Sequence, residues 1–245
     1  MLAAAVLMTG CSSGTGTPPG TAAVTESAAS PSPSVARALS QAELEAARLT
    51  EAEAPEYNVL LLDETLAEAE DQANVFALPF ACGNVLEVLA RGYADRAEGY
   101  TRANLILPEE FATEVYLTMT SYPPGRAEQV FTMVRNSLPH CESMEFESGY
   151  GERVPAELTA AKPVAAGDEA ISVHMSYSSR RGTESHASYV LVRTGEVIAL
   201  FKGDSHFGSS LPRRHKERLM PVVAKDLIAR QVAKVQRAQG RSHSL

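Results

Sequence analysis

The histidines are the residues whose chemistry would best serve catalysis or metal binding, and the chain has six of them. Only His174 and His186 could meet, across adjacent strands with Glu184 nearby, and imidazole and carboxylate groups are common metal ligands. The alternative is that both are ordinary histidines, at the surface or satisfied within the core. We favour this alternative, because no histidine pair has metal-ligand spacing, and expect no bound metal. The full set is His140, His174, His186, His206, His215 and His243.

Catalytic motifs are missing from the sequence. It contains no Gly-x-Ser-x-Gly elbow, His-Glu-x-x-His segment, phosphate-binding loop, Gly-x-Gly-x-x-Gly or Cys-x-x-Cys. A serine, His174 and an acid could form a triad on paper, but nothing positions them. The acidic pairs Asp63–Glu64 and Glu109–Glu110 are chain neighbours whose side chains diverge. We therefore expect a non-enzymatic protein with no catalytic residues and no cofactor.

Two predicted strands offer a polar face that could bind a ligand. In Val115–Tyr122, alternate residues are aromatic or carry hydroxyls, while Val115, Leu117 and Met119 point to the core. The strand Ala170–Tyr177 alternates in the same way. If the two strands are near neighbours, these side chains would line a cleft for a glycan or small polar ligand. The alternative is the ordinary solvent-facing side of an antiparallel sheet. The candidate ligand-binding residues are Tyr116, Thr118, Thr120, Tyr122, Ser172, His174 and Ser176.

Cys11 follows a short apolar run, Leu2–Met8, and precedes a stretch rich in Ser, Gly, Thr and Pro. An apolar run that ends in small residues is typical of an export signal. The segment Leu7–Cys11 resembles the bacterial lipobox, in which the chain is cut before the cysteine and the cysteine carries the lipid. Since the first basic residue is Arg37, we expect residues 1–10 to end a signal peptide whose start lies further upstream. The alternative is an unmodified cysteine in a disordered tail.

Two further cysteines remain if Cys11 is lipidated. Cys82 and Cys141 would then lie in a compartment that permits disulfides. Two cysteines allow a single intramolecular pairing, so we predict a Cys82–Cys141 disulfide. The alternative is two separate buried thiols.

Composition divides the chain into a tether and a folded domain. Residues 11–37 run from the lipidated cysteine through a linker that cannot bury enough apolar surface to become ordered. A flexible linker of this length spans roughly 25–30 Å. We place the folded domain at residues 38–239 and a disordered tail at 240–245. We expect no transmembrane helix, because the longest apolar run falls far short of the roughly 20 residues that such a helix needs.

Hydrophobic periodicity predicts mostly hairpin-linked strands with few helices between them, which is an α+β fold on a largely antiparallel sheet. Ser40 and Glu43 have the spacing of a capping box at the start of the first helix. The predicted helices are Ser40–Thr50, Cys82–Arg91, Ala127–Leu138 and a last one from Arg213 or Pro221 to Arg237. The predicted strands are Tyr57–Leu62, Tyr100–Leu107, Glu114–Tyr122, Ser143–Glu147, Ala170–Tyr177, Tyr189–Val192 and Val197–Phe201, of which the last two are expected to be central.

Charge is unevenly distributed around a net value of −8, which argues against non-specific nucleic-acid binding. Residues 37–170 contain 24 acidic and 9 basic residues, whereas residues 171–245 contain 5 acidic and 13 basic ones. We favour mutual compensation, with the basic last helix packed across the acidic part. The alternative is contact with anionic lipids or wall polymers. The basic residues concerned are Arg230, Lys234, Arg237 and Arg241.

The order of elements resembles that of the actinobacterial sensor-domain lipoproteins related to the extracellular domain of the kinase PknH. The resemblance spans about residues 40–239. It rests on a helix that begins at Cys82, strands through Val115–Leu117, a helix that leads into Cys141, a turn at Gly167–Glu169, and a hairpin through Val192–Val197. It implies an antiparallel sheet flanked by helices, with a cleft for an unidentified ligand. It implies no catalytic residues, and the second disulfide that is common in the family has no cysteines here.

These features predict a lipid-anchored protein on the extracytoplasmic face of the cell membrane, with a sensor-like domain that binds a small polar or cell-wall ligand. One alternative is a regulatory lipoprotein that restrains an envelope-stress sensor kinase through protein contact. Others are an envelope hydrolase and a lipid carrier.

Overall fold

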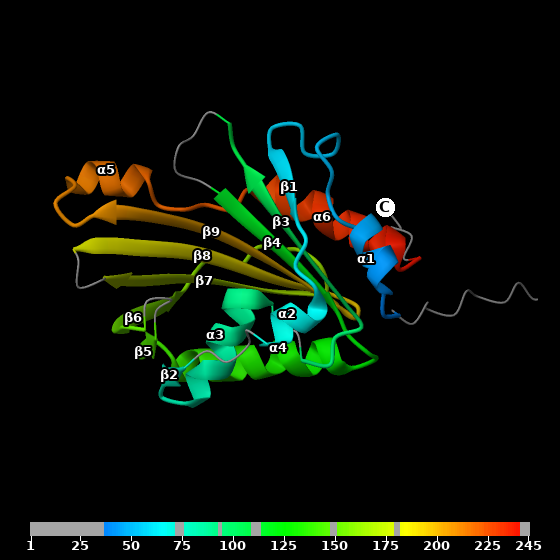
Figure 1. Cartoon of the computed structure of the whole chain (residues 1–245), viewed down its shortest axis with the longest axis horizontal. Coiled ribbons are helices and arrows are strands. Elements are labelled where there is room, and N and C mark those ends of the chain that lie inside the picture. The colour runs from blue at the N-terminus through cyan, green and yellow to red at the C-terminus, as the bar shows by residue number, and fades with distance from the viewer. Residues whose placement is uncertain are drawn as a thin grey trace, which may run out of the picture. The chain divides into compact units, whose positions relative to one another are not determined.

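One antiparallel sheet organises the computed structural model, which describes residues 37–71, 76–92, 95–108, 114–147, 151–178 and 182–240. Its strands are β1 (Asn58–Leu62), β2 (Ala77–Leu78), β3 (Gly99–Ile106), β4 (Glu114–Ser121), β5 (Ser143–Glu147), β6 (Arg153–Ala160), β7 (Glu169–Ser178), β8 (Thr183–Thr194) and β9 (Val197–Gly208). Within the described residues these nine strands have the order β1-β3-β4-β9-β8-β7-β6-β5-β2 (Figure 1). The expected α+β fold is confirmed.

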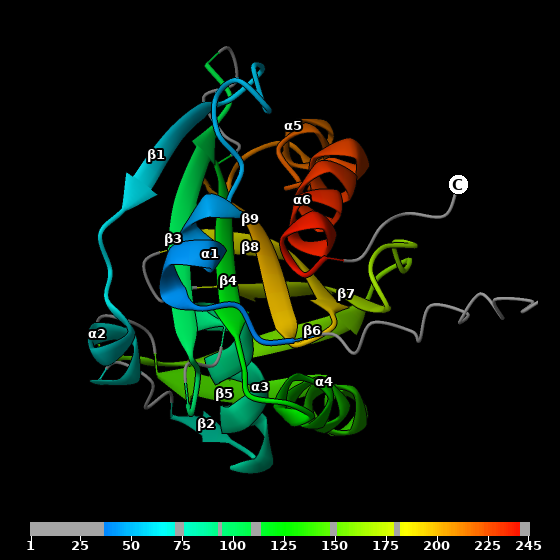
Figure 2. The same cartoon turned by 90° about the vertical axis from the view of Figure 1, so that its right-hand side faces the viewer.

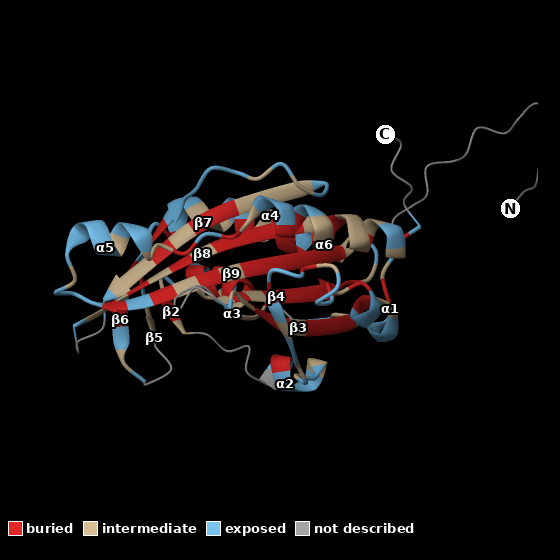
Figure 3. Cartoon of the chain, turned by 90° about the horizontal axis from the view of Figure 1, so that it is seen from above, coloured by how far each residue is buried: buried red, intermediate tan, exposed pale blue. Residues whose placement is uncertain are grey.

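Helices cover both faces of this sheet. They are α1 (Gln41–Ala46), α2 (Leu66–Asp71), α3 (Ala81–Arg91), α4 (Arg126–Ser137), the 3-10 turn η1 (Leu138–His140), α5 (Arg213–Arg218) and α6 (Lys225–Ala238). One core cluster joins α3 and α4 to one face, and a second joins α1 and α6 to the opposite face (Figure 2). We call these the α3 face and the α6 face. Burial is concentrated along β4, β9 and β8, between the two clusters (Figure 3).

Register shows which strand residues belong to which face. Leu117 pairs with Phe201, and Phe201 pairs in turn with Val190. All three are buried in the α6 cluster. The next residues along, among them Leu200 and Leu191, are buried in the α3 cluster. Strands β8 and β9 are therefore apolar on both sides over much of their length, as expected for central strands.

The first helix begins as the sequence predicts. Ser40 Oγ accepts a hydrogen bond from the Glu43 backbone N–H, and the Glu43 carboxylate accepts one from the Ser40 N–H. This reciprocal arrangement satisfies two of the donors that a helix start leaves unpaired. The helix is shorter than predicted: it ends at Ala46, whereas the prediction extended to Thr50.

The sequence prediction misses three elements and misjudges others. Strand β6 lies in a stretch where the sequence predicts no strand, because Pro155 interrupts the strand signal. In the structure Val154, Ala156 and Leu158 nevertheless alternate inward. Helix α2 and the two-residue strand β2 are too short to give a periodic pattern. Strands β8 and β9 each run for 12 residues, well beyond their apolar parts. The last predicted helix is two helices, α5 and α6.

The predicted disulfide is confirmed in the structure. Cys82 lies in the first turn of α3 and Cys141 directly follows η1, with a Cα–Cα distance of 5.6 Å. Both residues are fully buried in the α3 cluster. The disulfide therefore joins α3 to the end of α4 across the core.

Charge compensation between the two parts of the chain is also confirmed. Arg230 pairs with Glu56, and Lys234 Nζ lies 2.5 Å from a Glu53 carboxylate oxygen and 2.6 Å from the Arg48 carbonyl. Two of the four basic residues that we considered for lipid or polymer contact are thus engaged within the chain. Arg237 is exposed, and Arg241 lies outside the described residues.

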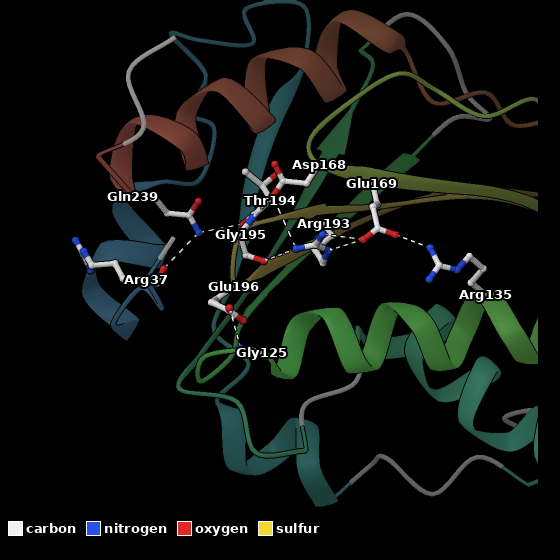
Figure 4. A network of polar contacts seen from close by, with 10 residues as sticks. All are labelled: Arg37, Gly125, Arg135, Asp168, Glu169, Arg193, Thr194, Gly195, Glu196 and Gln239. Atoms are coloured by element: carbon white, nitrogen blue, oxygen red, sulfur yellow. Dashed lines mark hydrogen bonds and ion pairs between the residues drawn. The ribbon is translucent and has the colours of Figure 1, made fainter. Parts of the chain in front are cut away.

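The turn between β8 and β9 gathers charged groups from several elements (Figure 4). Arg193 donates to Glu169, which also pairs with Arg135 of α4 at 2.6 Å. Gly195 N–H donates to Asp168 at 2.6 Å. The ion pairs at this turn connect it to α4 and to the start of β7, so we regard the network as structural.

Candidate functional site

The two polar strand faces of the sequence analysis lie on opposite sides of the sheet. Tyr116 pairs with Lys202, Lys202 with Tyr189, and Tyr189 with Val173. Side chains alternate along a strand, so His174 points to the face opposite that of Tyr116. Strands β9 and β8 also separate β4 from β7. The condition for a shared cleft, that β4 and β7 are near neighbours, is therefore not met.

Three of the four candidates on β4 or directly after it are buried beneath α3. Thr118, Thr120 and Tyr122 are 3%, 0% and 0% exposed. The Tyr122 hydroxyl donates to the carbonyl of Gly92, which ends α3, at 3.0 Å. A Cβ on Gly92 would lie 2.8 Å from Thr118 Cγ2, so the helix end approaches the strand closely. These three residues therefore line neither the predicted cleft nor the solvent-facing surface that was its alternative, because α3 covers them.

Tyr116 is the half-buried member of that strand. Its hydroxyl donates to a Glu114 carboxylate oxygen at 2.7 Å, and Lys202 Nζ lies 5.3 Å from the ring centroid. Burial and the hydrogen bond to Glu114 raise the pKa of Tyr116. The phenol therefore stays protonated and acts as a donor at neutral pH.

On the α6 face, two histidines form a stacked pair. His174 Nε2 lies 3.2 Å from His186 Nδ1, and their ring centroids are 5.4 Å apart with an interplanar angle of 21°. Burial, and then the neighbouring imidazole of His186, lowers the pKa of His174. Burial also lowers the pKa of His186, although Glu184 acts in the opposite direction. Both rings are therefore neutral at pH 7, and one donates its N–H to the other.

Charged and aromatic groups surround the outer side of His186. Its Nε2 lies 3.9 Å from a Glu184 carboxylate oxygen, and its ring stacks on Phe207 at 5.1 Å. Lys216 of α5 pairs with Glu184 at 2.7 Å. The two nitrogens of His186 thus face different partners and do not converge with His174 and Glu184 on one point. Among the described residues, no group of three His, Cys, Asp or Glu side chains could hold a metal ion.

A segment of chain crosses the sheet beside this pair. Ser188 Oγ lies 3.4 Å from His174 Nδ1 and donates to the Pro221 carbonyl at 2.7 Å. A Cβ on Gly203 would lie 3.4 Å from Pro221 Cβ, so the absence of a side chain there lets the segment approach the sheet. The Ser188 proton is committed to a backbone carbonyl. The hydroxyl is therefore not arranged as a nucleophile that gives its proton to His174.

A groove of about 350 Å³ opens next to His186. Glu157, Ser176 and His186 follow one another across β6, β7 and β8 as register partners, so they share the α6 face. Such a volume is at the lower end of small-molecule sites. The lining residues are Ser143, Pro155, Ala156, Glu157, Ser176, Tyr177, Ser178, Glu184 and His186.

Two buried hydroxyls next to the histidine pair have no hydrogen-bond partner among the described residues. They belong to Ser172, two residues before His174, and to Ser205, the register partner of His186. The two serines are 8% and 5% exposed. Together with the imidazoles, they make this part of the α6 face rich in hydrogen-bonding groups. Such groups suit a ligand that carries hydroxyl or amino groups.

The sequence predicts part of this site. Ser176 lines the groove, His174 adjoins it through His186, and Ser172 lies beside the pair. His186 and Glu184 entered the analysis only as metal ligands, whereas Ser143, Glu157 and Lys216 were missed. A signal for His186 existed in the alternation of His186, Ser188 and Val190 along β8. No pattern in one sequence indicates that β5 and β6 lie beside these residues.

Comparison with known proteins gives resemblance in structure only. No protein-family model matches the chain, and no curated protein matches it. The extracellular domain of PknH from Mycobacterium tuberculosis is similar in structure, with a TM-score of 0.48 and 12% sequence identity over 82% of this chain and 99% of that one. A putative uncharacterised protein of Mycobacterium smegmatis, the Rv0999 ortholog, gives a TM-score of 0.39 and 13% identity over 80% of this chain and 94% of that one. The chain resembles the PknH extracellular domain at the level of the fold.

No helix in the described part of the chain is both long and apolar enough to cross a membrane.

Proposed function

We propose that this protein is an extracytoplasmic, sensor-like binding domain that holds a small polar ligand in the groove beside His186. The observation that carries the proposal is the groove itself, which places hydroxyl, imidazole and carboxylate groups around a volume of about 350 Å³. The Glu157 carboxylate is exposed and has no ion-pair partner among the described residues, so it is free to accept hydrogen bonds. The favoured ligand carries several hydroxyl or amino groups, as cell-wall fragments do.

The test is a binding experiment with matched variants. Purified full chain is titrated with wall-derived sugars and amino sugars while its melting temperature and heat of binding are measured. We expect Glu157→Gln to weaken binding about tenfold, because it removes the charge from a charge-assisted hydrogen bond. Ser176→Ala should weaken binding several-fold, because it removes a neutral hydrogen bond. Tyr116→Phe on the opposite face serves as the control and should leave binding unchanged. Absence of binding by every ligand tested, or equal effects of all three variants, would contradict the proposal.

We further propose that Cys11 carries a lipid that anchors the domain to the extracytoplasmic face of the membrane. The support is the position of Leu7–Cys11 at the end of an apolar run and before a linker. In the native host, Cys11→Ser should move the chain from the membrane fraction to the soluble fraction. Mass spectrometry of the mature N-terminus should show an acylated cysteine in the parent chain. Recovery of both chains from the same fraction, without acylation, would refute the anchor.

A sensor needs a signalling partner, and the sequence resemblance makes a sensor kinase the first candidate. Affinity capture from membranes, with parent and Glu157→Gln chains as bait, would identify it. A kinase recovered by both baits, with ligand added or withheld, would favour restraint through surface contact over ligand sensing.

A further inference from the structure

Strand β1 forms an edge of the sheet that the described chain leaves open. β1 pairs with β3 on one side, and no described strand pairs with its other side. Its sequence, Asn-Val-Leu-Leu-Leu, contains neither a charge nor a proline. Natural edge strands usually carry one of these to prevent pairing with another chain. β1 therefore lacks the common protection against strand addition.

The side chains of this edge are unusually exposed. Leu60 and Leu61 are 54% and 49% exposed, and the described residues contain only two other large hydrophobic side chains that are exposed, Phe80 and Val222. Leu60 pairs with Asn104 and Leu61 with Ala103 in β3. The two leucines thus point to opposite faces of the sheet, and each face has an apolar group at its margin.

A groove lies directly beside β1 on the α6 face. It has a volume of about 420 Å³, and Val59 and Leu61 form its strand side. The opposite wall comes from the end of α1 and the segment after it. This wall contributes the apolar residues Ala46, Leu49 and Ala52, together with the charged residues Glu45, Arg48 and Glu51 and the hydroxyl of Thr50. An open strand edge next to an apolar groove is the arrangement in which proteins bind a further strand.

We propose that the occupant of this edge is β1 of a second copy of the chain, paired in antiparallel orientation about a two-fold axis at Leu60. In this register Leu60 of one copy lies opposite Leu60 of the other. Val59 of each copy lies opposite Leu61 of the other, so apolar residues meet on both faces. The exposed Leu61 of each copy then lies at the mouth of the other copy's groove, and both grooves receive the same side chain in one symmetric contact.

Charge does not oppose this pairing. The register brings Glu56 of one copy opposite Glu64 of the other, and two like charges across a strand pair are destabilising. However, Glu56 already pairs with Arg230, and Glu64 pairs with both Arg91 and Arg102. Each carboxylate is neutralised within its own copy. The central residues of β1 carry no charge at all.

The contact is small, so the dimer is weak and depends on concentration. Five residues of β1 and the groove wall contribute from each copy, whereas stable interfaces use about 20–30 residues a side. Confinement to a membrane surface would raise the local concentration and favour the paired state.

The first test uses charge at the two-fold axis. Full chain carrying Cys11→Ser, which removes both the lipid and the third thiol, is studied by sedimentation velocity over a wide concentration range. We expect a concentration-dependent dimer that Leu60→Lys and Leu60→Glu each weaken by about tenfold or more, since like charges then face each other. Mixing the two variants should restore dimers, because opposite charges then face each other. Val222→Lys, the same kind of apolar-to-lysine change at another exposed site, should have no effect. A parent that stays monomeric, or a mixture that stays monomeric, would overturn the proposal.

A second test reports the register directly. In the same background, Leu60→Cys should oxidise to a covalent dimer, because position 60 faces itself across the axis. Asn58→Cys is the control, since position 58 faces Leu62 and should cross-link far less. Equal cross-linking at both positions, or none at position 60, would contradict the register.

Discussion

At the scale of single residues, the histidine pair on the α6 face is sensitive to protonation. The N–H···N contact between His174 and His186 requires that at least one ring be neutral. Burial lowers the pKa of both rings. Glu184 raises the pKa of His186, whereas Lys216, which pairs with that glutamate, lowers it. The folded protein therefore favours the neutral form of both rings and disfavours their protonation.

We predict that the pair makes stability depend on pH. Because the folded-state pKa values lie below the ordinary value of about 6.5, the unfolded chain binds more protons in acid. The free energy of unfolding should be highest above that value and fall as the pH is lowered through it. In urea unfolding at pH 7.5 and 5.5, His174→Gln should lose less stability on acidification than the parent does. His215→Gln, at an exposed histidine, should keep the full pH dependence, and identical profiles for all three chains would contradict the prediction.

Gly92 is a second residue with a measurable role. It ends α3 with a φ of 79°, and an added Cβ would meet Thr118. We predict that Gly92→Ala lowers the free energy of unfolding by about 2–4 kcal/mol, from the left-handed backbone and the close contact together. Gly125→Ala is the matched control, because its φ is 78° but nothing lies within 4 Å of the added atom. It should cost only about 1–2 kcal/mol. Equal losses by urea unfolding would show that the close approach to β4 is unimportant.

At the scale of elements, α6 is positioned by a buried amide as well as by ion pairs. The Gln231 side chain donates to the Ala47 carbonyl at 2.7 Å and accepts from the Leu49 N–H at 3.0 Å. Gln231 is fully buried. These two bonds fix the helix against the segment that follows α1, where half of the groove beside β1 is formed.

Replacing this amide should cost more than breaking an ion pair of the same helix. Gln231→Leu leaves a buried N–H and a buried C=O without partners, at about 1–3 kcal/mol for each. We expect a loss of about 2–4 kcal/mol in chemical unfolding. Arg230→Gln, which breaks the partly exposed pair with Glu56, should cost about 1 kcal/mol or less. The reverse order would mean that charge compensation, rather than the amide, holds α6.

The disulfide connects two other elements, α3 and the end of α4, with a sequence separation of 59 residues. Closing a loop of this length restricts the unfolded chain. We predict that the double variant Cys82→Ala/Cys141→Ala loses about 2–5 kcal/mol of unfolding free energy. Guanidinium unfolding of both chains would measure this difference. No difference would show that the packing of α3 and α4 needs no covalent link.

At the scale of the whole molecule, the two core clusters share one sheet and should unfold together. Ile198 and Leu200 pack into the α3 cluster, while Ala199 and Phe201 of the same strand pack into the α6 cluster. We predict that Gly92→Ala on one face and Gln231→Leu on the other shift the same single transition. Far-ultraviolet and near-ultraviolet circular dichroism should give coincident curves for both variants. Two separate transitions, each sensitive to one variant, would contradict this.

The sequence predicts the fold better than it predicts the site. Helices α3 and α4 are evident because their apolar periodicity reflects burial against one face of the sheet. The strands of the β8–β9 hairpin are evident because they are continuous apolar runs, covered on both faces. The burial of Thr118, Thr120 and Tyr122 is not evident from the sequence, because alternation along the chain cannot reveal that α3 lies over their hydroxyls. The groove was only partly found because its walls come from four strands whose order depends on long-range pairing. Residue types suggest chemistry, but register decides which of them meet.

The place of β9 in the sheet has a consequence for how the chain reaches this structure. β9 lies between β4 and β8, although it is the last strand to be made. Until about Gly208 has emerged from the ribosome, or from an export channel, the edges of β4 and β8 that β9 joins lack their partner in this sheet. The sheet can therefore close into one piece only after β9 has been made.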